Sequence, residues 1–208
     1  MQQQPSQSTQ RHNQYKITSR PLHLELFTDR LDDCTWIPIP KNGYKVIKRL
    51  VKRHSYRQHF WHSGWQPTPQ QFVVIRNPIT RLFSALEECR FRSEDDLLYR
   101  MTWPELLDAF ALEPAVFDEH CEPQCYYLQG FTPTRWIRYN HMEKNFGMWN
   151  QFHHTAMISQ RRADASKSGD PWKLYSLYRD QVNRILNTHW ACDVDLWHNP
   201  LGSVDTLL

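Results

Sequence analysis

The sequence predicts an α/β fold in which a mostly parallel central sheet is flanked by helices. Two short apolar runs, at 34–39 and 72–75, each lead through a proline-containing turn into a segment with helical periodicity. Strand–helix–strand units of this kind place neighbouring strands parallel, with ligands at the strands' carboxyl ends. With 208 residues and 40% apolar composition, the chain suits one domain with a buried core. We expect a flexible polar tail at 1–20 and a single domain at 21–208.

The first predicted elements are a strand at 34–39, the turn 41–43 and a helix at 44–54 with an apolar face. The segment 59–65 is either a short strand or a loop. The second strand, at 72–75, consists of four consecutive apolar and mostly β-branched residues. Such a run is typical of a strand that is covered on both faces.

The helix after this strand has clear start signals. Asn77 suits the N-cap, and Pro78 suits the first helical position because its missing N–H has no helical partner to lose. Apolar side chains recur along the helix at helical spacing and give it one apolar face. Arg81, Ser84 and Glu88 fall on the opposite side of the helix.

Further along the chain, Thr102 is the expected cap of a helix that Pro114 ends. A strand at 135–139 and helices at 143–152 and 172–189 complete the predicted elements. No apolar run is long enough to span a membrane.

The cysteines and the N-terminus bear on the compartment. The chain has five cysteines with no C-x-x-C pair. This pattern predicts neither a zinc site nor a dense disulfide framework, although one Cys121–Cys125 bridge stays open. The N-terminus has no apolar signal core. We therefore expect a reducing, cytoplasmic location.

The charge distribution indicates an anion site. The window 34–86 contains nine Lys and Arg residues and no Asp or Glu, although the net charge of the whole chain is only +3. Such a local excess attracts polyanions. Arg76 ends the second strand and Ser84 lies two turns into the following helix, so both are placed to hold one phosphate across the turn.

The string RNPITRLFS at 76–84 resembles the 3′-phosphate-binding motif of sulfotransferases that use 3′-phosphoadenosine 5′-phosphosulfate (PAPS), written R-[DN]-P-x-x-R-x-x-S. Arg76, Arg81 and Ser84 stand in register with it. The resemblance implies that these three residues bind the cofactor.

The string PKNGYK at 40–45 resembles the 5′-phosphosulfate loop of the same family, P-K-x-G-[ST]-[ST]. A turn of this kind directs backbone N–H groups and the positive end of a helix at an anion. Tyr44 and Lys45 depart from the pattern, which has small hydroxyl residues there. The resemblance implies that the loop binds the cofactor through Lys41, Asn42, Gly43, Tyr44 and Lys45.

Two later segments, DEHCEPQ at 118–124 and WIRYNHMEKNF at 136–146, resemble the carbohydrate (Golgi-type, sulfotransferase family 2) branch. The resemblance covers about 36–190. It implies the P-loop-like sulfotransferase fold, no metal, and in-line transfer of a sulfuryl group to an acceptor hydroxyl on a saccharide or glycan. Because the chain shows no anchor, we expect a bacterial or viral member, the latter working in the cytosol of an infected host, or an excised catalytic domain.

The resemblance also implies two catalytic roles. Lys41 would stabilise charge on the leaving phosphate, and the acceptor hydroxyl needs a general base. No carboxylate lies between the two cofactor motifs, so a base from that window is a histidine, His62 first and His59 second. His120, or Glu119 beside it, is the rival from outside the window.

Two other functions stay open. A catalytically degenerate relative would bind the nucleotide without turnover, which the departures at 44–45 allow. A nucleic-acid-binding module would use the basic segment 41–57 and its neighbouring aromatics for phosphate contacts and base stacking. The basic residues gather at two turns rather than along one face, which favours the nucleotide cofactor.

Overall fold

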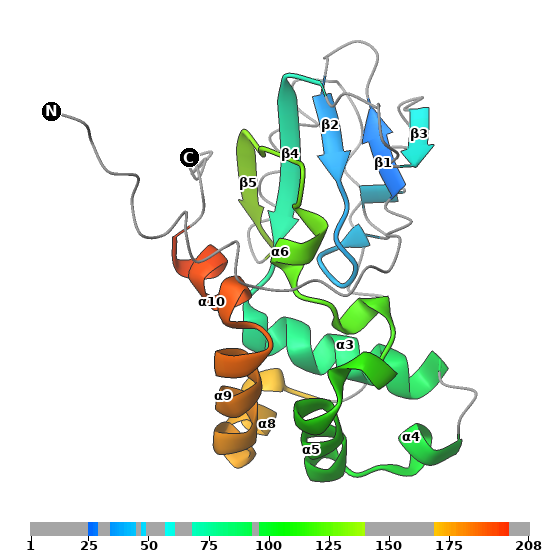
Figure 1. Ribbon diagram of the computed structural model, residues 1–208, viewed down its shortest axis with the longest axis vertical. Helices are drawn as coiled ribbons and strands as arrows, with labels where there is room; N and C mark the ends of the chain where they lie inside the picture. Colours follow the sequence, from blue (N-terminus) through cyan, green and yellow to red (C-terminus); the bar gives the residue numbers. More distant parts are fainter. Residues whose placement is uncertain are drawn as a thin grey trace, which may run out of the picture.

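A mixed β-sheet with a group of helices at one end makes up the part of the chain that is described (Figure 1). The predicted α/β class is therefore confirmed. The computed structural model describes residues 25–28, 34–44, 47–48, 57–60, 68–92, 96–139 and 169–199.

The sheet has five strands in the order β3-β1-β2-β4-β5. Its strands are β1 (Glu25–Thr28), β2 (Cys34–Ile37), β3 (Arg57–Phe60), β4 (Gln70–Ile75) and β5 (Arg135–Arg138). β2, β4 and β5 are parallel, as predicted. β1 pairs antiparallel with both β2 and β3, so the sheet is mixed rather than mostly parallel. The four residues of β1 were not predicted as a strand, since so short a segment has little periodicity.

The central strands are covered on both faces. Val74 of β4 packs on one face with Ile47, from the helical segment after the turn. Val73 packs on the other face with Tyr127 of α6 (Gln124–Tyr127) and Leu196 of α10 (Ala191–His198). Because successive side chains of a strand alternate between faces, this double cover explains the uninterrupted apolar run in β4.

A second core lies among helices beyond the carboxyl ends of β2, β4 and β5 (Figure 1). It is formed mainly by α3 (Pro78–Arg92), α5 (Trp103–Leu112) and α9 (Arg179–Thr188). The shorter helices are α4 (Asp96–Arg100), η1 (Pro114–Val116), η2 (Glu119–Cys121) and α8 (Pro171–Leu177). In the described part of the chain, no helix is both long and apolar enough to cross a membrane.

The predicted helix starts are confirmed. Asn77 Oδ1 accepts a hydrogen bond from the Ile79 N–H at 3.0 Å, and α3 begins at Pro78. Glu105 Oε2 accepts from the Thr102 N–H at 2.7 Å, so Thr102 caps α5. These signals are local, which is why sequence alone locates them.

Two predicted elements have wrong boundaries, and one helix was missed. The first strand ends at Ile37 rather than at residue 39, since the following Pro38 has no N–H to donate to the sheet. The helix at 172–189 is two helices, because Tyr178 between them has φ −123° and ψ 34°. The third helix of this region, α10, was not predicted. The segment 59–65 lies in β3 as far as residue 60, while its remainder and the predicted helix at 143–152 lie outside the described residues.

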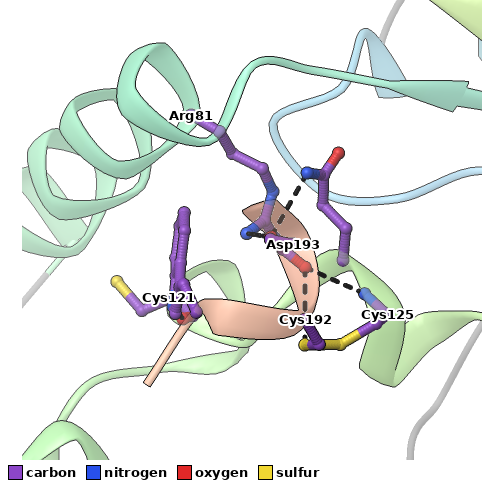
Figure 2. Close-up of a disulfide and its surroundings, with 7 residues drawn as sticks. Arg81, Cys121, Cys125, Cys192 and Asp193 are labelled. Carbon is purple, nitrogen blue, oxygen red and sulfur yellow. Dashed lines mark hydrogen bonds and ion pairs between the residues drawn. A yellow bond between two sulfur atoms is a disulfide. The ribbon is translucent and has the colours of Figure 1, made fainter. Parts of the chain in front are cut away.

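Cys125 forms a disulfide with Cys192, joining α6 to α10 (Figure 2). The alternative Cys121–Cys125 bridge is therefore wrong. Disulfides persist in oxidising compartments. The bond thus weighs against the expected reducing cytosol.

Candidate anion-binding site

The turn after β2 has an unusual backbone. Lys41 has φ 67° and Gly43 has φ 84°, both in the left-handed region. The Asn42 N–H donates to Ile39 O at 3.1 Å and closes the turn, and the Ile47 N–H donates to Gly43 O at 3.0 Å and starts the next helix. A lysine with positive φ is uncommon and is found most often at functional turns.

Gln124 fastens this turn to β4. Its Oε1 accepts from Asn42 Nδ2 at 2.5 Å and from the Arg76 N–H at 2.8 Å. Its Nε2 donates to Arg76 O at 3.0 Å and to Asp193 Oδ2 at 3.2 Å. Asn42 Nδ2 also donates to Val74 O at 2.8 Å. Asn42 and Gln124 are both buried, so the Asn42 side chain holds the turn in place.

Arg76 reaches across from the end of β4 to the same turn. Its Nη1 donates to Lys41 O at 2.9 Å, and its Nε donates to Thr80 Oγ1 at 3.2 Å. The guanidinium lies 4.7 Å from the ring centroid of Tyr139. Burial lowers the pKa of Arg76, because the charged group loses hydration there. An anion bound beside it would offset that loss.

Besides its backbone contact with Arg76, Lys41 contacts α3 through its ammonium group. Its Nζ lies 3.1 Å from Glu88 Oε2, with the side chain 20% exposed. The backbone of Lys41 thus contacts the Arg76 guanidinium, and its ammonium group contacts Glu88 of α3. Thr80 and Ser84 lie between positions 76 and 88 at four-residue spacing and share one helix face. Arg76, just before α3, and Thr80 and Ser84 of α3 form a polar stripe, with Lys41 alongside.

The structure places Arg81 differently from Ser84. Ser84 is 9% exposed, and no hydrogen bond of its hydroxyl is found within the described residues, so the hydroxyl can serve a ligand. Arg81 is completely buried, with Nη1 3.7 Å from Asp193 Oδ2 (Figure 2). Its Nη2 donates to His120 O at 3.4 Å. Its guanidinium lies 4.7 Å from the ring centroid of Trp190. In this arrangement the Arg81 side chain is enclosed by protein and joins α3 to the segments that carry His120, Trp190 and Asp193.

Tyr44 occupies the position where the resembled loop has a small hydroxyl residue. Its ring packs with the apolar cluster on one sheet face. Its hydroxyl accepts from Lys48 Nζ at 3.0 Å. Both contacts fix Tyr44 on the sheet side of the helix. Lys45 lies outside the described residues.

Among the predicted bases, His120 has an orienting partner. Its Nδ1 lies 3.0 Å from Asp118 Oδ1, and the imidazole is 13% exposed. Burial alone would raise the pKa of Asp118, but hydrogen bonds from His120 and Cys89 outweigh it and lower the pKa to about 2. The carboxylate is therefore ionised and holds the proton of His120 on Nδ1, which leaves Nε2 as the basic atom.

For the other candidate bases, the structure describes no orienting partner of the side chain. The backbone of His59 lies in β3, opposite Leu26, with β1 and β2 between it and β4. His62 lies outside the described residues. The Glu119 side chain is exposed, and its carbonyl accepts from the Tyr127 hydroxyl.

No family model, curated protein or solved structure matches this chain.

Sequence reasoning missed four residues of this region. Thr80 and Glu88 carried a signal, because they continue the four-residue spacing from Arg76 through Ser84. Gln124 lies in the segment 118–124 that resembles the family, but no local pattern indicates its role, and Asp193 carried no local signal. Their partners are brought to them only by the tertiary fold.

Proposed function

We propose that this chain is a PAPS-dependent sulfotransferase of the carbohydrate branch, with the sulfotransferase fold and an acceptor hydroxyl on a saccharide or glycan. The observation that carries the proposal is the hydrogen bond from Arg76 Nη1 to Lys41 O, at 2.9 Å between residues 35 apart in sequence. It joins the two stretches that resemble the family's cofactor motifs. The turns that bear them follow adjacent parallel strands, where α/β sheets bind ligands.

The residues that would hold the cofactor follow from their positions. Arg76 and Ser84 suit the 3′-phosphate, since one supplies a partly buried charge and the other a hydroxyl without a protein partner in the described chain. Lys41 and the backbone of Gly43 suit the 5′-phosphosulfate. Arg81 would act indirectly, by positioning α3 against α10. When bound, the cofactor supplies the sulfuryl group that passes to the acceptor.

Lys41 is placed to assist the leaving group. An ammonium group beside the phosphate stabilises negative charge as it develops there, and it does so most strongly where water is partly excluded. The Lys41 side chain is only 20% exposed. Its present partner, Glu88, shows that the ammonium group reaches along α3 over the stripe.

His120 is the described residue best suited to be the general base. The Asp118 carboxylate fixes its ring, so Nε2 can take the acceptor's proton. Cys89 contacts Asp118, and Glu88 contacts Lys41. Because 88 and 89 are consecutive on α3, the base and Lys41 lie beside the same turn of that helix.

Isothermal titration with 3′-phosphoadenosine 5′-phosphate tests the binding step. We expect micromolar affinity in the unaltered chain, and a loss of at least tenfold in Arg76→Ala and in Ser84→Ala, about 1.4 kcal/mol or more. Arg179→Ala and Ser176→Ala, which alter exposed residues of the same types, are the matched controls. Absence of nucleotide binding, together with salt-sensitive affinity for oligonucleotides, would instead support the nucleic-acid module.

Transfer of labelled sulfate from PAPS to a panel of polysaccharides tests turnover. Lys41→Ala and His120→Asn should lower kcat by about 10²-fold or more with little change in nucleotide affinity for the latter. A chain that binds the nucleotide but transfers sulfate to no saccharide, alcohol or amine would be the degenerate relative. Restoration of transfer by Lys45→Thr would then locate the defect in the loop.

A further inference from the structure

Four of the five cysteines gather around one segment, 118–125, which lies between α3 and α10. Cys125 is bonded to Cys192 of α10. Cys121, four residues earlier, lies beside Cys89 of α3. The fifth, Cys34, is in β2 and belongs to the sheet core.

The two unbonded thiols of this group are unusually close. Cys89 Sγ and Cys121 Sγ are 3.3 Å apart, and each residue is 4% exposed. Ordinary nonbonded contact between heavy atoms is roughly 3.5–4.0 Å even for carbon, which is smaller than sulfur. A sulfur–sulfur bond is about 2.05 Å long, so the sulfurs need to approach by little more than about 1 Å. The backbone of Cys121 is already fixed, since Trp190 Nε1 donates to its carbonyl at 3.0 Å.

A metal ion is the rival occupant, because Asp118 lies beside both sulfurs. The Asp118 oxygen that faces them is already used. Its Oδ1 accepts from Cys89 Sγ at 2.9 Å, from the His120 N–H at 2.8 Å and from His120 Nδ1 at 3.0 Å. Arg81 is close enough to Cys121 to affect its titration, and a fixed cation disfavours a second one. Two thiols alone do not make a zinc site, which takes four ligands when structural.

We propose that Cys89 and Cys121 form a second disulfide, which ties α3 to the segment that carries Asp118 and His120. The bond forms when a small-molecule or protein disulfide oxidises the pair. The two thiols lose two electrons and two protons, one sulfur–sulfur bond forms, and the oxidant is reduced to two thiols. Burial raises the pKa of Cys121, so the reactive thiolate is scarce in the folded chain and the bond forms while the chain folds.

The consequence is a doubly anchored segment. With Cys125–Cys192, the new bond would hold 118–125 to α10 on one side and to α3 on the other. His120 and Gln124 both lie within this segment. The inference does not depend on what the site binds, since it follows from the positions of the sulfurs alone.

Thiol counting on the full chain tests the proposal. The reduced, denatured protein is refolded in a glutathione redox buffer. It is then denatured again in the presence of an alkylating reagent, and its intact mass is measured. We expect one alkylated cysteine, Cys34, because two disulfides use four of the five. Cys34→Ser should then leave none. Three alkylated cysteines would overturn the proposal. If the folded chain with three free thiols also holds one zinc ion, which is released when the thiols are modified, Cys89 and Cys121 would instead be metal ligands.

Peptide mapping without reduction identifies the partners. Trypsin places Cys89 in 82–90, Cys121 with Cys125 in 101–135, and Cys192 in 185–208. The three peptides should elute as one disulfide-linked species, and reduction should separate them. In the double variant Cys125→Ser/Cys192→Ser, 82–90 should stay linked to 101–135. Separate peptides in that variant, with the intact chain also showing three thiols, would refute the Cys89–Cys121 bond.

Discussion

Lys41 Nζ lies 3.1 Å from Glu88 Oε2, so the lysine of the β2 turn is paired with a carboxylate on α3. Burial alone would raise the pKa of Glu88, but its contacts with Lys41 and Arg92 outweigh this and lower the pKa. Glu88 is thus ionised at neutral pH. An anion that enters the site meets this carboxylate as a competitor for Lys41.

Glu88→Gln should therefore tighten binding of 3′-phosphoadenosine 5′-phosphate. A partly exposed ion pair contributes about 0.3–1 kcal/mol, so its loss should raise the affinity about two- to fivefold in a titration. Arg92→Gln is the control, since it breaks the other contact of Glu88 and leaves Lys41 paired. Weaker binding in Glu88→Gln would show that the carboxylate supports the ligand instead of competing with it.

Gln124→Ala should destabilise the fold and disorder the site together. The substitution removes four hydrogen bonds and leaves buried partners on Asn42, Arg76 and Asp193 without them. We expect the free energy of unfolding in urea to fall by about 2–4 kcal/mol. Gln129→Ala alters an exposed glutamine nearby and should change it by less than about 0.5 kcal/mol. A stable Gln124→Ala variant that still binds the nucleotide would contradict the role of Gln124 as the residue that fastens the turn.

The elements that sequence located best have local signals. The strand at 72–75 was recognised from consecutive β-branched residues, and the helix after it from Asn77 and Pro78. The mixed sheet was missed because no local pattern marked 25–28 as a strand, and because the direction of β1 depends on its pairing with β2 and β3. The disulfide partner of Cys125 was missed because connectivity cannot be deduced from cysteine spacing.

In the candidate site, too, the features with a local sequence signal were predicted and those that depend on distant partners were not. The fold brings the turn with Lys41 to Arg76 at the end of β4, as the two motifs predicted, while the binding of a cofactor there stays a prediction. Arg81 was expected on the polar face of its helix. It is buried because Asp193 of α10 and Trp190, just before that helix, pack on that side, and no local pattern predicted α10. A helix face that looks polar can thus be a buried face with a distant partner.

Arg81→Gln should lower the free energy of unfolding by about 3–5 kcal/mol, because it leaves Asp193 as a buried charge without its ion pair. Urea denaturation followed by fluorescence measures the change. The double variant Arg81→Leu/Asp193→Leu should recover part of the loss, since replacing both partners removes the uncompensated charge. Unchanged stability together with a large loss of nucleotide affinity would return Arg81 to the role of a ligand contact.

The Asp118–His120 contact should make stability depend on pH in the acid range. With Cys89 as a thiol, under reducing conditions, the pKa of Asp118 in the folded chain is about 2, below its ordinary 3.8. Its contribution is therefore complete above about pH 4 and is lost as the pH falls toward 2. Because 36% of the side chain is exposed, we discount the shift for solvent screening and expect about 1–2 kcal/mol. Asp118→Asn should therefore be less stable than the unaltered chain at pH 6, and the two should converge near pH 2.

Urea denaturation at a series of pH values measures this difference. Asp108→Asn, on the exposed face of α5, is the matched control and should change stability by less than about 0.5 kcal/mol at each pH. A difference between Asp118→Asn and the unaltered chain that stays constant down to pH 2 would show that lost packing, rather than the charge on Asp118, is responsible. The carboxylate would then not be the group that orients His120.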